Sequence, residues 1–246
     1  MKLLKAAILS LMCVLPTSAF SKNVAVVLMY HRIAEVENDM NTTPERFAQQ
    51  MEYLHSNNYN VITGEELVSD IQNKKEVAPK TVVITFDDGW ASQKAAMDIL
   101  QKYKYPGMFA LVTEYQQFKN KTYLQPEDFE KYKANNFTYV NHSHTHFIKD
   151  FIRRPDYDVA LSKLQIIKST GKFVPIYVYP YGKRSKALVK ALKNNGYVAA
   201  FGVYGAPVDV QKADIYNINR YMMNDKVDMD RFEKIVGVTL PNDKVG

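Results

Sequence analysis

The chain has 246 residues, of which 46% are hydrophobic and 24% are charged, and its formal net charge is +6 at pH 7. This basic excess is spread along the sequence, in pairs such as Lys74–Lys75 and Arg153–Arg154, and does not form the clustered basic face that nucleic-acid binding requires. Cys13 is the single cysteine. The composition therefore argues against nucleic acid as a partner and against a scaffold held together by disulfides.

Residues 1–21 are predicted to be a secretory signal peptide. They combine a short basic start, an apolar run over residues 6–15 and small residues before an expected cleavage after Ser21. The apolar run is shorter than the roughly 20 residues that span a membrane, so export is favoured over an uncleaved anchor. Residues 22–246 would then form one exported domain without cysteine or membrane span. Its net charge would be +4, because the two lysines of the signal are removed.

Along residues 22–246, short apolar runs rich in β-branched residues alternate with amphipathic helical patterns. Helices are predicted from Pro44, behind an N-cap at Thr43, around Ala95 and Ile99, over 159–167 and over 187–192. Six runs are predicted to be buried strands: Val24–Tyr30, Thr81–Phe86, Gly107–Val112, Thr138–Val140, Val174–Tyr179 and Tyr197–Phe201. Strands separated by helices indicate βαβ units and therefore a parallel sheet or barrel. In such folds the chemistry gathers at the carboxyl ends of the strands.

Two adjacent carboxylates, Asp87 and Asp88, follow the second predicted strand and precede Gly89. Two acids at one strand end repel each other and resist burial, so a cation is the usual compensation. Because adjacent residues point in different directions, one can bind a metal while the other faces a substrate. An isolated Asp-Asp-Gly also fits a helix N-cap followed by a turn, so this motif needs support from elsewhere in the chain.

That support comes from Asn141-His-Ser-His-Thr-His146, where three of the five histidines follow another predicted strand. His142 and His146 are four residues apart, so one helical turn would place both imidazoles on the same side. Two histidines and one carboxylate supply three ligands and leave positions for water and substrate, as in catalytic metal sites. His144 is expected to be exposed or to lie behind the ligands.

Two further strand ends carry candidate residues. Tyr177-Val-Tyr-Pro-Tyr-Gly182 runs into a Pro-Tyr-Gly turn that can present a backbone N–H to a developing oxyanion. The apolar run Val26–Tyr30 ends in His31, which in isolation is more often a structural residue than a catalytic one.

Taken together, these motifs resemble the polysaccharide deacetylase family, the NodB-like carbohydrate esterases of family 4, over roughly Val24 to Arg220. Thr-Phe-Asp-Asp-Gly and His-Ser-x-x-His are its specific elements, and Pro-Tyr-Gly is supportive. The resemblance implies a distorted (β/α) barrel of about seven strands. It also implies Asp87 as general base, a divalent metal on Asp88, His142 and His146, and the Tyr181 amide at the oxyanion.

The sequence departs from the family pattern in three places. Val178 and Tyr179 stand where the family has an arginine that orients the catalytic aspartate, and Asp-x-x-Asp-Trp is absent, Trp90 being the only tryptophan. No histidine follows His146, so the C-terminal Leu-x-His that supplies the general acid is also missing.

A circular permutation explains the missing acid. The branch that deacetylates biofilm poly-N-acetylglucosamine carries a Met-Tyr-His-x-Ile strand before the Asp-Asp strand, and this chain resembles that branch at Met29-Tyr-His-Arg-Ile33. By this resemblance His31 is the general acid. Arg220, in Ile-Asn-Arg-Tyr, is the proposed replacement for the lost arginine beside Asp87.

The resemblance implies a metal-dependent hydrolase that removes N-acetyl groups from N-acetylglucosamine-type sugars, with Zn as the first choice of metal and Co, Ni, Fe or Mn as alternatives. The partner would be an N-acetylated glycan outside the cytoplasm, in the periplasm or secreted, with a loose association with the cell envelope. Three other functions remain open: an O-acetyl esterase, a non-catalytic metal-bearing glycan-binding protein, and an iron oxygenase built on the same ligand set. The sequence does not distinguish poly-β-1,6-N-acetylglucosamine, chitin oligomers, peptidoglycan or a lipid-linked amino sugar.

Overall fold

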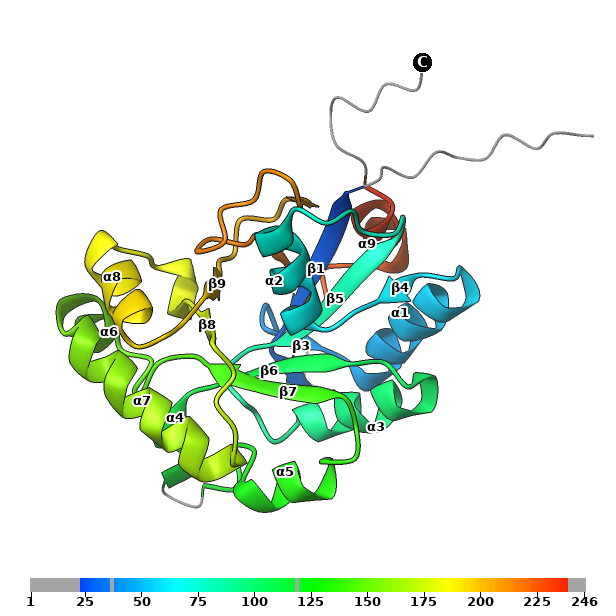
Figure 1. Ribbon diagram of the computed structural model, residues 1–246. Coiled ribbons are helices and arrows are strands. Elements are labelled where there is room, and N and C mark those ends of the chain that lie inside the picture. The colour runs from blue at the N-terminus through cyan, green and yellow to red at the C-terminus, as the bar shows by residue number, and fades with distance from the viewer. Residues whose placement is uncertain (1–22, 36–37, 118–119, 239–246) are drawn as a thin grey trace, which may run out of the picture.

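A curled, mainly parallel sheet forms the centre of the molecule, with β10 antiparallel to β1 (Figure 1). The computed structural model describes residues 23–35, 38–117 and 120–238, and the predicted signal peptide lies outside the described residues. The main path of the sheet is β10-β1-β5-β6-β7-β8-β9, with β4 paired to β5 and β11 paired to β1. Its strands are β1 (Val24–Tyr30), β4 (Asn60–Val61), β5 (Thr81–Phe86), β6 (Gly107–Leu111), β7 (Phe137–Asn141), β8 (Ile176–Val178), β9 (Ala199–Phe201), β10 (Val208–Asp209) and β11 (Tyr221–Met222), and a separate pair joins β2 (Arg32–Ile33) to β3 (Asn41–Thr42).

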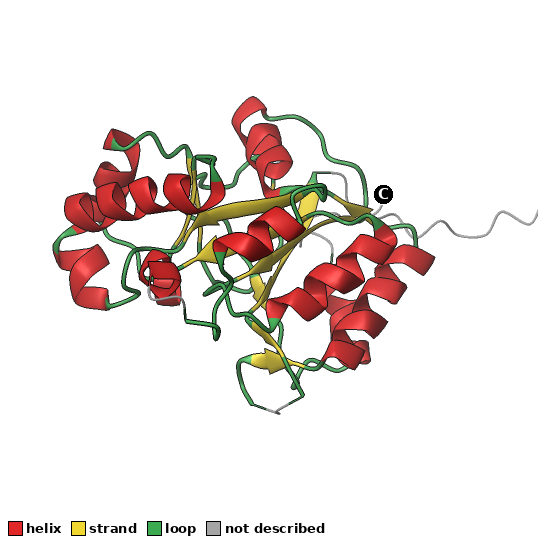
Figure 2. Cartoon of the chain, turned by 90° about the horizontal axis from the view of Figure 1, so that it is seen from below, coloured by secondary structure: helices red, strands yellow, loops and turns green. Residues whose placement is uncertain are grey.

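Helices lie around the sheet, as the view from below shows (Figure 2). They are α1 (Pro44–Ser56), α2 (Gly64–Asn73), α3 (Gln93–Tyr103), α4 (Thr113–Gln117), α5 (Pro126–Lys131), α6 (Ile148–Arg153), α7 (Pro155–Thr170), α8 (Lys186–Asn194) and α9 (Met229–Val236), with a 3-10 turn, η1, at Pro180–Gly182. The Thr43 side chain caps α1 by accepting a hydrogen bond from the Arg46 N–H, as its Thr-Pro start predicts. No helix within the described ranges combines the length and the apolar character that crossing a membrane would need.

Both faces of the central strands are buried, which explains why β1 and β5 are apolar throughout. Val26, Leu28 and Tyr30 pack in the cluster that includes residues of α1, α3 and α9, whereas Ala25 and Val27 pack in a second cluster that includes residues of α2. Successive side chains of a strand point to opposite faces, so a strand covered on both sides reads as a continuous hydrophobic run.

The predicted α/β class and a curled sheet with seven strands in its main path are confirmed. The six predicted strands are β1 and β5 to β9, and the predicted helices correspond to α1, α3, α7 and α8. Helices α2, α4, α5, α6 and α9 were not predicted.

Segments from opposite ends of the chain meet beside the Asp-Asp strand. β1 pairs in parallel with β5, with Tyr30 opposite Phe86, and β11 pairs in parallel with β1. His31 and Asp87 therefore follow two neighbouring strands at the same edge of the sheet. This adjacency is the arrangement that the proposed circular permutation requires.

Candidate active site

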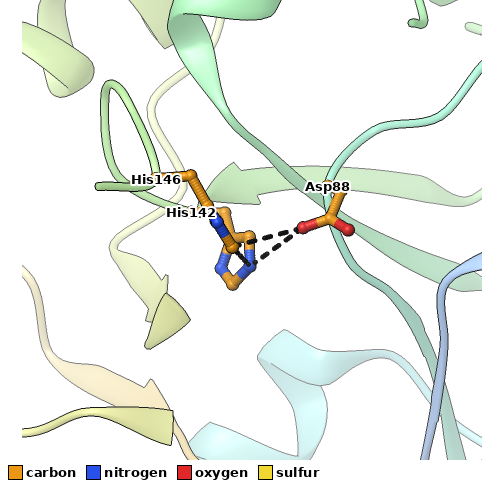
Figure 3. A group of neighbouring side chains, drawn as sticks. All are labelled: Asp88, His142 and His146. Carbon is orange, nitrogen blue, oxygen red and sulfur yellow. Dashed lines mark hydrogen bonds and ion pairs between the residues drawn. The ribbon is translucent and has the colours of Figure 1, made fainter. Parts of the chain in front are cut away.

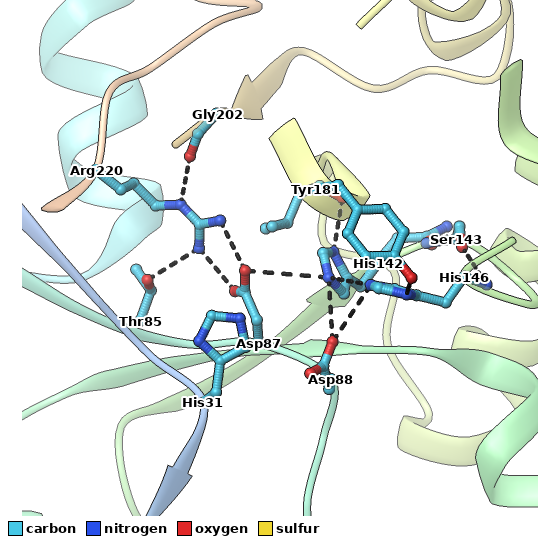
Figure 4. A network of polar contacts seen from close by, with 12 residues as sticks. His31, Thr85, Asp87, Asp88, His142, Ser143, His146, Tyr181, Gly202 and Arg220 are labelled. Atoms are coloured by element: carbon cyan, nitrogen blue, oxygen red, sulfur yellow. Dashed lines mark hydrogen bonds and ion pairs between the residues drawn. The ribbon is translucent and has the colours of Figure 1, made fainter. Parts of the chain in front are cut away.

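A cavity of about 360 Å³ opens at the carboxyl ends of β1, β5, β7 and β8. Six of the seven predicted site residues line it, and the seventh, Arg220, lies behind Asp87 (Figure 4). The complete lining is Met29, His31, Met40, Asp87, Asp88, His142, His146, Tyr181, Val203 and Met222.

Asp87 forms a buried, bidentate salt bridge with Arg220. The Nη1 and Nη2 atoms of Arg220 donate to Oδ1 and Oδ2 of Asp87, each at 2.7 Å, and the two residues are 0% and 2% exposed. Arg220 also donates to Thr85 Oγ1 and to the Gly202 carbonyl, which fixes the guanidinium plane. Burial alone would raise the pKa of Asp87, but the charge and hydrogen bonds of Arg220 together with the neighbouring His142 and His31 outweigh it and hold that pKa below its usual value. Asp87 is therefore ionised and rigidly oriented.

His31 reaches the cavity from β1, next to Asp87. The Asp87 N–H donates to the Tyr30 carbonyl at 2.8 Å, and the Gln93 side-chain amide donates to the carbonyls of both His31 and Asp87, at 2.9 and 2.6 Å. Gln93 thus ties the two strand ends together. His31 is 9% exposed, and its Nδ1 has no hydrogen-bond partner among the described residues. Burial lowers the pKa of His31, although the charges of Asp87 and Asp88 act to raise it.

Asp88 points away from Asp87 because the backbone turns sharply at this position. Asp88 and Gly89 both have left-handed backbones, with φ of 71° and 72°. A side chain at Gly89 would place its Cβ 2.9 Å from Leu111, so only glycine fits there without a shift. The turn directs Asp88 Oδ1 to 3.4 Å from Nε2 of both His142 and His146 (Figure 3).

These three side chains form a donor set suited to a metal ion. The two imidazole Nε2 atoms are 3.2 Å apart. Ligands at about 2.0–2.1 Å from a tetrahedral ion lie roughly 3.3–3.4 Å from one another, which matches the separations of this set. The Nδ1 of His142 lies 2.9 Å from the Val178 carbonyl and donates there, so a bound metal would take the Nε2 lone pair. Burial lowers the pKa of His142, but Asp87, Asp88 and the Val178 carbonyl together raise it in the metal-free protein. Burial and the neighbouring His142 lower the pKa of His146 to about 4, which keeps its ring neutral.

The expected helical turn between His142 and His146 is wrong, because residues 142–147 form a loop. Ser143 and His146 adopt left-handed backbones, with φ of 68° and 66°. Ser143 Oγ accepts the His146 N–H at 2.9 Å, and Asn141 Oδ1 accepts the Ser143 N–H at 2.8 Å. Asp158 on α7 accepts the His144 N–H at 3.1 Å. Hydrogen bonds from backbone N–H groups to side-chain oxygens, and not a helix, bring the two imidazoles together.

His144 and Tyr181 are the remaining residues of the two motifs. His144 is half-buried, and its Nδ1 contacts Thr113 Oγ1 at 3.1 Å, outside the donor set. Tyr181 has a left-handed backbone, φ 55°, and a side chain that is 59% exposed, with its hydroxyl 3.0 Å from His146 Nδ1. The sequence singled out only the backbone amide of Tyr181, so the contact of its phenol with His146 is new.

Sequence reasoning also missed Trp90, Gln93, Thr85 and Asp158. Trp90 donates from Nε1 to Asp88 Oδ2 at 2.9 Å. Its position directly after Asp-Asp-Gly, as the only tryptophan of the chain, was the available signal. Gln93, Thr85 and Asp158 act through contacts between distant segments, for which a single sequence gives no signal.

Residues 74–200, just over half of the chain, match the family model described as polysaccharide deacetylase. The putative polysaccharide deacetylase YxkH of Bacillus subtilis is 25% identical over 174 residues, which cover 70% of this chain and 61% of that protein. The poly-beta-1,6-N-acetyl-D-glucosamine N-deacetylase of Staphylococcus epidermidis is 24% identical over 247 residues, covering 88% of this chain and 83% of that protein.

Among solved structures, the Streptococcus pyogenes deacetylase PplD in complex with acetate has a TM-score of 0.80 at 18% identity, covering 88% of this chain and 99% of that one. This similarity confirms the predicted NodB-like fold. The match to the family model begins after β1 and ends at Ala200, so the segments that carry His31 and Arg220 lie outside it.

Proposed function

The chain belongs to the polysaccharide deacetylase family, and from this premise we propose that it is a metal-dependent hydrolase that removes N-acetyl groups from N-acetylglucosamine units of a polysaccharide. The observation that carries the proposal is the cavity in which the Asp88–His142–His146 donor set faces Asp87, Arg220 and His31. Acetate and a free amino sugar would be the products.

Asp88, His142 and His146 would hold one divalent ion, Zn being the first choice for this nitrogen and oxygen donor set. When bound, such an ion supplies Lewis acidity: it lowers the pKa of a water ligand and polarises the acetyl carbonyl.

Asp87 is proposed as the general base. It accepts a proton from the attacking water while the water oxygen bonds to the acetyl carbon. The two hydrogen bonds from Arg220 keep Asp87 ionised and aim its carboxylate, so little reorganisation is needed in the reaction. Arg220 thereby takes the place of the family arginine missing before Pro-Tyr-Gly.

His31 is proposed as the general acid. It donates a proton to the amide nitrogen as the C–N bond breaks, because an amine that departs without a proton is a very poor leaving group. Asp87 accepts one proton and His31 gives one, so the C–N bond breaks to acetic acid and a neutral amine. The acetic acid then loses its proton to solvent as acetate, and the proton on Asp87 is returned to His31 before the next turnover. The backbone N–H of Tyr181 is proposed to stabilise the negative charge that develops on the acetyl oxygen.

The substrate is proposed to be an N-acetylated glycan outside the cytoplasm, reached after export by the signal peptide at residues 1–21. The Staphylococcus epidermidis relative is named for poly-β-1,6-N-acetyl-D-glucosamine, which makes this polymer the first glycan to assay. A loose association with the cell envelope fits the net positive charge of the chain.

The test is acetate release by the exported chain, residues 22–246, with Zn²⁺ added. The panel comprises β-1,6-linked N-acetylglucosamine oligomers, chitin oligomers, peptidoglycan fragments and an O-acetylated glycan. Acetate and an equal amount of free amine from one of the N-acetylated glycans is the expected result. Acetate from the O-acetylated glycan alone would identify an esterase, and tight binding of a glycan without any acetate would identify a binding protein; either result would overturn the proposal.

A further inference from the structure

The two oxygens of Asp88 have different partners. Oδ1 is the oxygen that lies 3.4 Å from Nε2 of both His142 and His146, and it is the oxygen directed at the donor set in Figure 3. Oδ2 accepts the indole Nε1–H of Trp90 at 2.9 Å. Because the Asp88 side chain is only 13% exposed, this hydrogen bond replaces solvation that Oδ2 would otherwise lack.

The Trp90 indole is fixed on both of its faces. The Arg32 guanidinium carbon lies 3.7 Å from the ring centroid, and the Tyr123 ring stacks on the indole at 4.6 Å with an interplanar angle of 28°. Two groups this close to one ring cannot share a face, so they lie on opposite sides of it. Tyr115 extends the stack, with its ring 4.1 Å from that of Tyr123. The backbones of Trp90 and Tyr123 are also joined by an antiparallel bridge.

This sandwich makes a sugar-binding role for Trp90 unfavourable. An aromatic ring that stacks on a sugar needs a free face, and both faces of the Trp90 indole are covered. The edge that remains carries the N–H, and it is directed at Asp88.

We propose that Trp90 is a positioning residue that makes Asp88 a ligand through one oxygen only. This inference rests on the proposed metal site. Holding Oδ2 in a hydrogen bond keeps the carboxylate from rotating to offer both oxygens. An ion on Asp88 Oδ1, His142 and His146 then keeps positions free for water and for the acetyl oxygen. Partners that orient a metal ligand from behind commonly contribute 10- to 100-fold in affinity, so the loss of this one should change metal affinity by about that factor.

Trp90→Phe tests the inference because it keeps an aromatic ring in the stack and removes the N–H. Its dissociation constant for Zn²⁺, measured by competition with a chelator, should rise by about 10- to 100-fold. With Co²⁺ in the site, visible absorption should weaken, because a second Asp88 oxygen raises the coordination number. The matched control is Tyr103→Phe, which removes another aromatic donor to a carboxylate, Glu52, at 2.6 Å. It should change neither property.

A second replacement covers the case in which Trp90→Phe fails to fold. Because the chain has a single tryptophan, growth with benzothienylalanine changes only residue 90. This amino acid has a sulfur atom of similar size in place of the indole N–H. A wild-type Zn²⁺ affinity and Co²⁺ spectrum in this protein would overturn the inference, and a weaker affinity with an altered spectrum would support it. If metal binding survives in His142→Ala and His146→Ala, the proposed site itself fails, and the Trp90 inference fails with it.

Discussion

Asp87 and His31 lie at the ends of two paired strands, whereas His142 and His146 lie on a loop after β7. We call the first group, with Arg220, the strand half of the cavity and the second group the loop half. The strand half is almost fully buried, and the register of β1 on β5 sets it. The loop half includes His146, whose side chain is 15% exposed. Its shape is set by backbone N–H groups that donate to the side chains of Ser143, Asn141 and Asp158.

The two halves are therefore held in place by different contacts: strand pairing in the strand half and local hydrogen bonds in the loop half. The strand half is fixed by the fold, so damage there should affect proton transfer, and loss of its buried Asp87–Arg220 ion pair should also affect global stability. The loop half is fixed by local polar contacts, so damage there should affect metal affinity first.

The largest expected effect is that of Asp87→Asn on turnover. The variant keeps the shape of the side chain and removes the proposed base, so kcat should fall by about 10²- to 10⁴-fold. Metal content should stay near that of the wild type, because Asp87 lies outside the donor set. Elemental analysis and acetate-release kinetics check both points. Asp88→Asn, in contrast, should lose bound metal, because Asp88 is in the donor set. A variant with near wild-type turnover would remove Asp87 from the mechanism.

Arg220→Met should strongly destabilise the fold. It leaves the Asp87 carboxylate buried without its partner, and breaking a buried pair costs about 3–5 kcal/mol of unfolding free energy. The control is Arg184→Met, which breaks an exposed pair with Asp214 at 2.8 Å and should cost about 0–1 kcal/mol. Urea unfolding of the metal-free proteins measures both. Equal losses in the two variants would show that the strand half does not depend on this ion pair.

His142→Ala and His146→Ala should weaken metal binding by about 10²- to 10³-fold each. Structural zinc sites with four ligands bind with about 10–16 kcal/mol, which is about 2.5–4 kcal/mol per ligand. The metal-free variants should keep nearly the wild-type melting temperature. His144→Ala is the matched control, because His144 belongs to the same motif and lies outside the donor set. A loss of affinity in His144→Ala as large as in the other two would contradict the assignment of ligands.

The smallest effect concerns Asp158, which supports the loop half from α7. Burial raises the pKa of Asp158 to about 6, against an ordinary value of about 3.9. The folded protein thus prefers the protonated form, so this group's contribution to stability is complete below about pH 4 and is lost as pH rises through about 6. The shift corresponds to about 1–3 kcal/mol. The unfolding free energy of Asp158→Asn relative to wild type should therefore improve by that amount between pH 4.5 and 7.5 in metal-free protein. Parallel profiles for the two proteins would contradict a protonated Asp158.

The same division explains how much the sequence predicts. β1 and β5 are continuous apolar runs, so their bounds and the polar residues that follow them can be identified directly. The loop after β7 gives no such pattern: its four-residue spacing of histidines suggests a helix, and left-handed residues at Ser143 and His146 produce the same proximity by another route. Hydrogen bonds across long sequence separations, such as Gln93 to the His31 carbonyl or Arg220 to Thr85, depend on packing that a single sequence does not contain.

The most direct test of this account is single-turnover acetate release by His31→Gln, with metal content and melting temperature measured on the same protein. His31 enters the site only because β1 lies beside β5, so it tests the permuted arrangement and the mechanism together. We expect turnover to fall by about 10²- to 10⁴-fold, the range for a positioned acid, with metal content and melting temperature close to wild type. Turnover close to wild type, with only a lower melting temperature, would contradict the account and leave His31 as a structural residue at the end of β1.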